Sequence, residues 1–173
     1  MSSSNRKRSA GFAVMLTAVT LAVVGSAVPA TLACGSSPRP ASPSPGVERA
    51  LERGQSLYDA QQYEAATEAL MQAMVEAEAE DDLFGRAVCY IALTLCQLRL
   101  GNTQAAARML GEASRIKPHL EVEQPNVDAA QLQLLFGRYH EAQAELAKAQ
   151  GNDDEAARHL DAAERYYTRR ARG

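Results

Sequence analysis

The sequence predicts an all-α protein made of paired helices packed side by side, and three observations support this fold class. First, the pattern Ala-x3-Leu-x2-Ala occurs four times, starting at Ala66, Ala106, Ala142 and Ala156. Each triple falls on one face of a helix, and its alanines let a neighbouring helix approach closely. Second, a residue suited to a turn lies five positions before each triple, at Gln61, Gly101, Gly137 and Gly151. Third, the chain has no Trp, only three Phe and abundant Ala, which favours packing through small side chains.

The first four helices follow from these turns and from helical periodicity. We expect a helix from Val47 to about Ala60, because Ala50, Gly54 and Leu57 share a face, and a second from Tyr63 to about Ala79. A third, Leu83–Leu100, is apolar over much of its circumference, which indicates a central position between neighbours, with Ala92, Leu93 and Cys96 among the most buried residues. The fourth runs from Thr103 to about Ile116 and closes at Pro118.

The C-terminal third is expected to contain an extended connector and three helices. Residues 118–125 are predicted to be extended, with Leu120 and Val122 pointing the same way onto the array. Asn126 is suited to cap a helix that ends near Phe136, Gly137 then turns the chain, and Tyr139–Gln150 returns. Asn152 caps a last helix whose first turn is acidic. We therefore expect three helix hairpins and a capping helix.

The pattern resembles the tetratricopeptide repeat, a helix-turn-helix unit with small and large residues at fixed positions and a proline near its end. The fullest match is Gly101, Ala106, Leu110, Ala113 and Pro118. The resemblance covers residues 47–173. It implies an all-α, right-handed α-solenoid of about three such hairpins, closed by the C-terminal helix. The family's repeats are scaffolds for unrelated pathways, so the resemblance implies protein binding without naming a partner.

The resemblance also implies a groove along the first helices of the repeats, which would bind an extended segment or helix of a partner protein. The family's groove positions correspond to Gln55, Tyr58, Asp59, Ile91, Leu95, Leu98, Arg99, Gln131 and Leu134. The competing interpretation is that Leu95, Leu98 and Leu134 are ordinary core residues.

The N-terminus has the order of features found in a secretory signal. Residues 1–10 carry Arg6, Lys7 and Arg8, residues 11–27 are almost wholly apolar, and Pro29 precedes a run of small residues. We interpret residues 1–33 as a signal peptide that directs the chain to a bacterial cell envelope. A retained membrane anchor is the alternative, because the apolar run is near the minimum spanning length.

Two processing sites compete. Residues 31–34 resemble the lipoprotein box, in which the cysteine, here Cys34, becomes lipidated and N-terminal, and residues 34–46 would then form a Gly/Ser/Pro tether to the membrane facing the periplasm. Cleavage at Ala30 would instead release a secreted or periplasmic protein. Cys34 could also be free or disulfide-bonded. Cys89 and Cys96, seven residues apart on one helix, are too distant to bridge each other and are expected to pack on a common face.

Composition and motifs argue against nucleic-acid binding and catalysis. From residue 35 onward, 15 Lys and Arg face 21 Asp and Glu, a net charge of −6, whereas nucleic acid requires a basic face. No phosphate loop, nucleophile elbow or metal-ligand motif is present, and the three histidines are interpreted as surface residues. We predict a non-catalytic interaction scaffold without cofactor or metal. The alternative is a structural accessory lipoprotein of a secretion, pilus or motility machine.

Overall fold

The computed structural model describes residues 43–122 and 128–172, and within these ranges the chain is entirely helical apart from turns. Six helices are present there, and no strand. They are α1 (Pro45–Asp59), α2 (Tyr63–Ala79), α3 (Leu83–Arg99), α4 (Thr103–Val122), α5 (Ala129–Ala149) and α6 (Asp153–Arg172). The predicted signal peptide, Cys34 and most of the expected tether lie outside the described residues.

The last two residues of the expected tether, Pro45 and Gly46, belong to α1. The side-chain oxygen of Ser44 accepts a hydrogen bond from the backbone N–H of Val47 at 3.3 Å, so Ser44 is the N-cap. Pro45 follows in the first turn, where its missing N–H costs no helical hydrogen bond. Asp82 caps α3 and Asp128 caps α5 in the same way. The expected cap, Asn126, lies outside the described residues.

Four inter-helix turns share one geometry. Each has three residues, and the middle residue has a positive φ: Gln61 at 60°, Asp81 at 54°, and Gly101 and Gly151 at 78°. In each turn the third residue donates its N–H to a carbonyl five positions earlier, as Gln62 does to Leu57 at 2.9 Å and Asn102 to Gln97 at 2.8 Å. This pattern satisfies carbonyls at the end of the preceding helix and reverses the chain within three residues.

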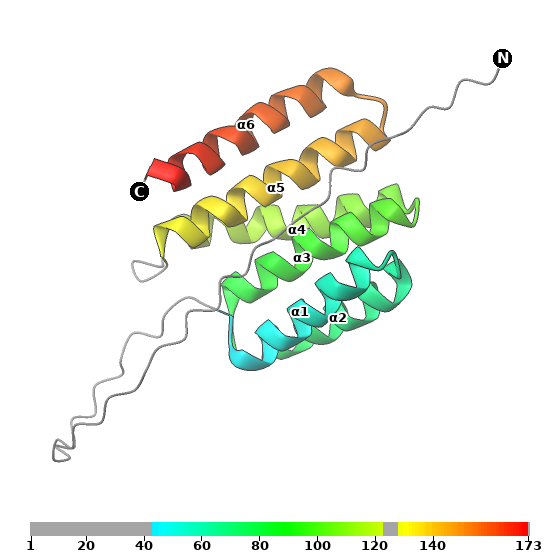
Figure 1. Ribbon diagram of the computed structural model, residues 1–173, viewed down its shortest axis with the longest axis vertical. Coiled ribbons are helices and arrows are strands. Elements are labelled where there is room, and N and C mark those ends of the chain that lie inside the picture. The colour runs from blue at the N-terminus through cyan, green and yellow to red at the C-terminus, as the bar shows by residue number, and fades with distance from the viewer. Residues whose placement is uncertain (1–42, 123–127, 173) are drawn as a thin grey trace, which may run out of the picture. The chain divides into compact units, whose positions relative to one another are not determined.

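Consecutive helices therefore lie next to each other, and α3 is the centre of the packing (Figure 1). Helix α3 packs against α1, α2, α4 and α5, and α6 packs against α5 at the opposite end from the α1–α2 pair. Leu93 and Cys96 are buried as expected, while Ala92 is half-buried. One core cluster, with Leu70, Cys89 and Cys96, joins α1, α2 and α3. A second core cluster, with Ile91 and Phe136, joins α3, α4 and α5.

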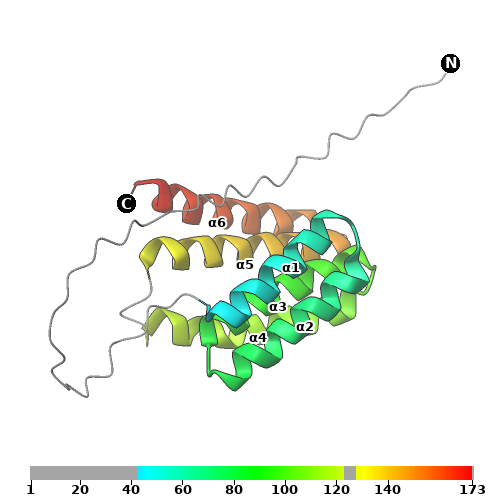
Figure 2. The ribbon, with the colours of Figure 1, turned by 60° about the horizontal axis from the view of Figure 1, so that its bottom comes forward.

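The prediction of a turn at Gly137 is wrong. Helix α5 runs unbroken from Ala129 to Ala149, and Gly137 lies buried within it. Its role is a close helix–helix contact, because a Cβ there would meet the ring of Tyr167 on α6, with Cζ at 2.7 Å and Cδ1 at 2.8 Å. The expected third hairpin and separate capping helix are therefore a single pair, α5 and α6 (Figure 2).

The prediction that Pro118 ends the fourth helix is also wrong. Helix α4 continues to Val122 with Pro118 inside it, so the first part of the expected extended connector is helical. Proline removes one helical hydrogen bond, but the extra turn buries Leu120, which is 1% exposed in the core shared with α5. Val122 is 81% exposed and does not point the same way as Leu120, because two helical positions differ by about 200°.

The four Ala/Leu/Ala triples differ in how deeply they are buried. Two are fully buried, those of α2 and α4, and Ala156 and Ala163 of the α6 triple are buried as well. Leu160 between them is 43% exposed, because no later described helix packs on α6. The triple that starts at Ala142 ends at the exposed Ala149 and follows no turn, since it belongs to the middle and end of α5.

Candidate protein-interaction surface

The nine residues of the predicted groove lie on α1, α3 and α5, the first helix of each consecutive pair. Helix α3 packs against both α1 and α5, so it brings the three sets together. Gln55, Asp59 and Arg99 are exposed, while Tyr58, Leu95, Leu98, Gln131 and Leu134 are half-buried. Ile91 is only 5% exposed and packs in the core with Phe136, so its side chain is not accessible to a partner.

Arg99 connects the three helices. Its Nε donates a hydrogen bond to the hydroxyl of Tyr58 on α1 at 3.0 Å, and its Nη1 lies 3.6 Å from Oε2 of Glu145 on α5. Burial alone would lower the pKa of Arg99, but the hydrogen bond with Tyr58 and the charge of Glu145 outweigh it, so the pKa is raised. One guanidinium therefore links α1, α3 and α5 on the same side of the fold.

Tyr58 is held in place from two directions. Its ring makes an edge-on contact with Tyr63 of α2, with ring centroids 5.3 Å apart, and its hydroxyl accepts from Arg99. Burial raises the pKa of Tyr58, against the opposing effect of the Arg99 charge. The tyrosine therefore stays neutral near pH 7 and contributes an aromatic edge and a hydroxyl to the surface.

Helix α5 extends this surface beyond the predicted residues. Gln131, Leu134, Arg138, Glu141 and Glu145 are spaced three and four positions apart and so lie along one stripe of α5. Arg138 Nε is 3.9 Å from Glu141 Oε2. Burial lowers the pKa of Arg138, and the negative charges of Glu141 and of Asp59 on α1 act in the opposite direction. The stripe reaches α3 at Glu145, which pairs with Arg99, and Glu141 hydrogen-bonds to Tyr167 of α6.

We call Tyr58, Arg99, Arg138, Glu141 and Glu145 the inter-helix polar cluster. Three of its members, all on α5, were not predicted from the sequence. Their absence from the prediction follows from the turn expected at Gly137, which would have placed residues after it on an outer helix. The spacing that continues the Gln131–Leu134 stripe through Glu145 is the signal that could have identified them.

The histidines and cysteines of the described chain that lie outside this surface include two that stack between α5 and α6 and two that are buried in α3. Within residues 43–122 and 128–172, no group of three or more His, Cys, Asp or Glu is placed to hold a metal ion. His140 and His159 stack with ring centroids 5.7 Å apart, between α5 and α6. Cys89 and Cys96 are fully buried and pack in the core between α2 and α3, and burial raises the pKa of Cys89 to about 12 and that of Cys96 to about 11.

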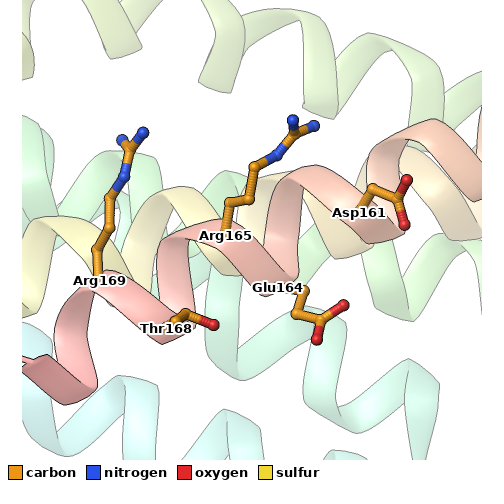
Figure 3. A pocket seen from close by; sticks show the side chains of 5 residues that line it. All are labelled: Asp161, Glu164, Arg165, Thr168 and Arg169. Atoms are coloured by element: carbon orange, nitrogen blue, oxygen red, sulfur yellow. The ribbon is translucent and has the colours of Figure 1, made fainter.

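An open depression on α6 is lined by residues of that helix: Asp161, Glu164, Arg165, Thr168 and Arg169. All five are exposed, and Figure 3 shows them projecting from one helix, with the two arginines extending side by side. Charged side chains in full contact with solvent lack the desolvated setting that shifts pKa values for catalysis. The depression is therefore a solvated helix face.

Among the described residues, no helix is both long and apolar enough to cross a membrane. The predicted lipid site, Cys34, is outside these residues. Comparisons with protein-family models, curated proteins and solved structures found no match for the chain.

Proposed function

We propose that this protein is a non-catalytic scaffold of a bacterial cell envelope, which binds a segment of a partner protein on the surface formed by α1, α3 and α5. The observation that carries the proposal is the composition of that surface. Tyr58, Leu98 and Arg99 lie partly exposed along neighbouring helices, and Arg99 contacts both Tyr58 and Glu145. Aromatic and Arg side chains are the types that most often dominate binding at protein interfaces.

The resemblance to the tetratricopeptide repeat supports the same proposal. In this interpretation the three helix pairs form a right-handed solenoid, with first helices along its concave side. The Gly54 position suits this packing, because a Cβ there would lie 2.7 Å from the side chain of Leu70 on α2. A signal peptide over residues 1–33 and a lipid on Cys34 would place the domain at the membrane, facing the periplasm.

The test is a site-specific crosslink from the proposed surface. A photoreactive amino acid replaces the exposed Gln55 in one variant and Arg108, exposed on α4, in a control variant. Illumination in the native envelope should give a discrete crosslinked partner from position 55 and none from position 108. The additional substitution Leu98→Glu should abolish that product while circular dichroism shows the fold retained.

Equal crosslinking from both positions, or a product that survives Leu98→Glu, would contradict the proposed surface. Mass spectrometry of the mature N-terminus separately tests the predicted signal peptide and lipid anchor. It distinguishes lipid on Cys34, cleavage at Ala30 and an intact leader.

A further inference from the structure

The outer face of α2 differs from the matching faces of α4 and α6. Met71 and Val75 are 58% and 64% exposed, one turn apart on this face. Counted from the positive-φ turn residue, the same positions are Gly111 and Arg115 on α4 and Asp161 and Arg165 on α6, all of them exposed. Figure 3 shows the α6 pair as charged side chains that project from the helix. An apolar pair in this position is therefore specific to α2.

Glutamates flank the apolar pair along the same face. Glu64, Glu68, Met71, Val75 and Glu78 follow each other at intervals of four, three, four and three residues, which places them on one stripe of the helix. All three glutamates are exposed, and α2 contains no Lys, Arg or His. We call these five residues the α2 stripe. It has an apolar centre and negative ends.

We propose that the α2 stripe docks a cationic amphipathic helix of another protein, at a site separate from the α1–α3–α5 surface. The choice of occupant rests on charge complementarity. Leu or Met side chains at three- and four-residue spacing would cover Met71 and Val75, and Lys or Arg on either side would meet the glutamates. A methionine at the centre of such a site adapts to different apolar side chains.

Two other occupants fit the stripe less well. An anionic lipid surface would be repelled by Glu64, Glu68 and Glu78. A second copy that docks α2 against α2 would bring the same glutamates together across a two-fold interface, since such an interface pairs a surface with itself. Like charges in close apposition disfavour that contact.

The test uses a fluorescently labelled 18-residue peptide of Leu and Lys with Leu at helical spacing, and a second peptide in which Glu replaces Lys. Binding to the full chain is measured by fluorescence anisotropy at low and high salt. The Lys peptide should bind, with weaker binding at high salt, and the Glu peptide should not. Met71→Gln/Val75→Gln, which keeps every charge, should weaken binding by about tenfold or more. Glu64→Gln/Glu68→Gln, which keeps the apolar pair, should also weaken it and reduce its salt dependence.

Matched controls separate this site from the rest of the molecule. Leu160→Gln changes an exposed leucine on α6 in the same way and should leave peptide binding unchanged. Leu98→Glu, the test of the proposed function, should leave it unchanged as well. Binding unaffected by Met71→Gln/Val75→Gln would overturn the proposal. So would equal binding of the Glu peptide, binding to anionic vesicles, or a wild-type dimer in sedimentation that dissociates on Met71→Gln/Val75→Gln.

Discussion

Gly137→Ala tests how α5 and α6 fit together. Alanine is favoured over glycine inside a helix by about 1 kcal/mol, so the substitution would stabilise an unobstructed helix. At Gly137 the added Cβ would overlap the ring of Tyr167, with Cζ at 2.7 Å and Cδ1 at 2.8 Å. Tyr167 also hydrogen-bonds to Glu141, so moving the ring disturbs a second contact. Overpacking of this kind costs about 1–3 kcal/mol.

Gly111→Ala on α4 is the matched control, because Gly111 is also inside a helix and a Cβ there meets nothing within 4 Å. We expect Gly111→Ala to raise the free energy of unfolding by about 1 kcal/mol. Gly137→Ala should give no gain or a loss of up to about 2 kcal/mol, once the propensity gain is set against the overlap. Urea denaturation followed by circular dichroism at 222 nm measures both values in one experiment.

A double-mutant cycle with Tyr167→Ala identifies the cause. Once the ring is absent, Gly137→Ala should stabilise the protein about as much as Gly111→Ala does, by about 1 kcal/mol. Equal stabilisation by Gly137→Ala and Gly111→Ala in the wild-type background would refute the close contact. Equal destabilisation by Gly137→Ala with and without Tyr167 would instead indicate a positive-φ turn at this position, as the sequence pattern predicted.

Three further predictions concern the turns, α4 and pH. Gln61→Gly should raise the free energy of unfolding by about 0.5–1 kcal/mol, because glycine adopts the observed φ of 60° without the left-handed strain of glutamine; urea denaturation measures this, and a loss would contradict it. Pro118→Ala should stabilise by about 1–3 kcal/mol in the same assay by restoring a hydrogen bond within α4, whereas a helix that ended there would gain little. Burial and the nearby charge of His159 lower the pKa of His140 from its ordinary 6.5. As the pH falls, the His140 imidazole is therefore protonated in the unfolded chain before it is protonated in the folded protein. The melting temperature should therefore decrease below about pH 6.5, and His140→Phe should reduce that decrease; an unchanged pH profile would show that His140 does not cause it.

The bounds of α1, α2 and α3 could be predicted to within about two residues, because local signals mark both ends of each helix. Gln61 and Gly101 occupy the positive-φ positions that end α1 and α3, and Asp82 caps α3. Each of these signals acts over only a few neighbouring residues, so it can be recognised in the sequence. The central position of α3 was also predictable, since apolar residues cover most of its circumference.

The prediction failed where one residue type serves two purposes. Gly137 sits in a local sequence that matches the turns, but its missing side chain is used for contact with Tyr167, 30 positions later. No local pattern separates these roles. Helix length does contain a signal: a turn at Gly137 would have left two helices of about a dozen residues, whereas α1 to α4 have 15 to 20. The helix end expected at Pro118 also could not be judged from local sequence. Helix α4 stays helical past Pro118 because Leu120 is buried against α5, which is distant in sequence.

The unbroken α5 places a second partner beside Arg99. With α5 unbroken, Glu145 lies on the same stripe as Leu134, and Arg99 contacts it while also contacting Tyr58. The Arg99 and Glu145 side chains are 46% and 35% exposed, and a pair so accessible to water contributes about 0–1 kcal/mol to stability. Core packing around α3 supplies far more than that. Core packing therefore sets the spacing of the three helices, and the contribution of Arg99 is to hold Tyr58 and Glu145 in defined orientations on the face that we propose as the binding surface.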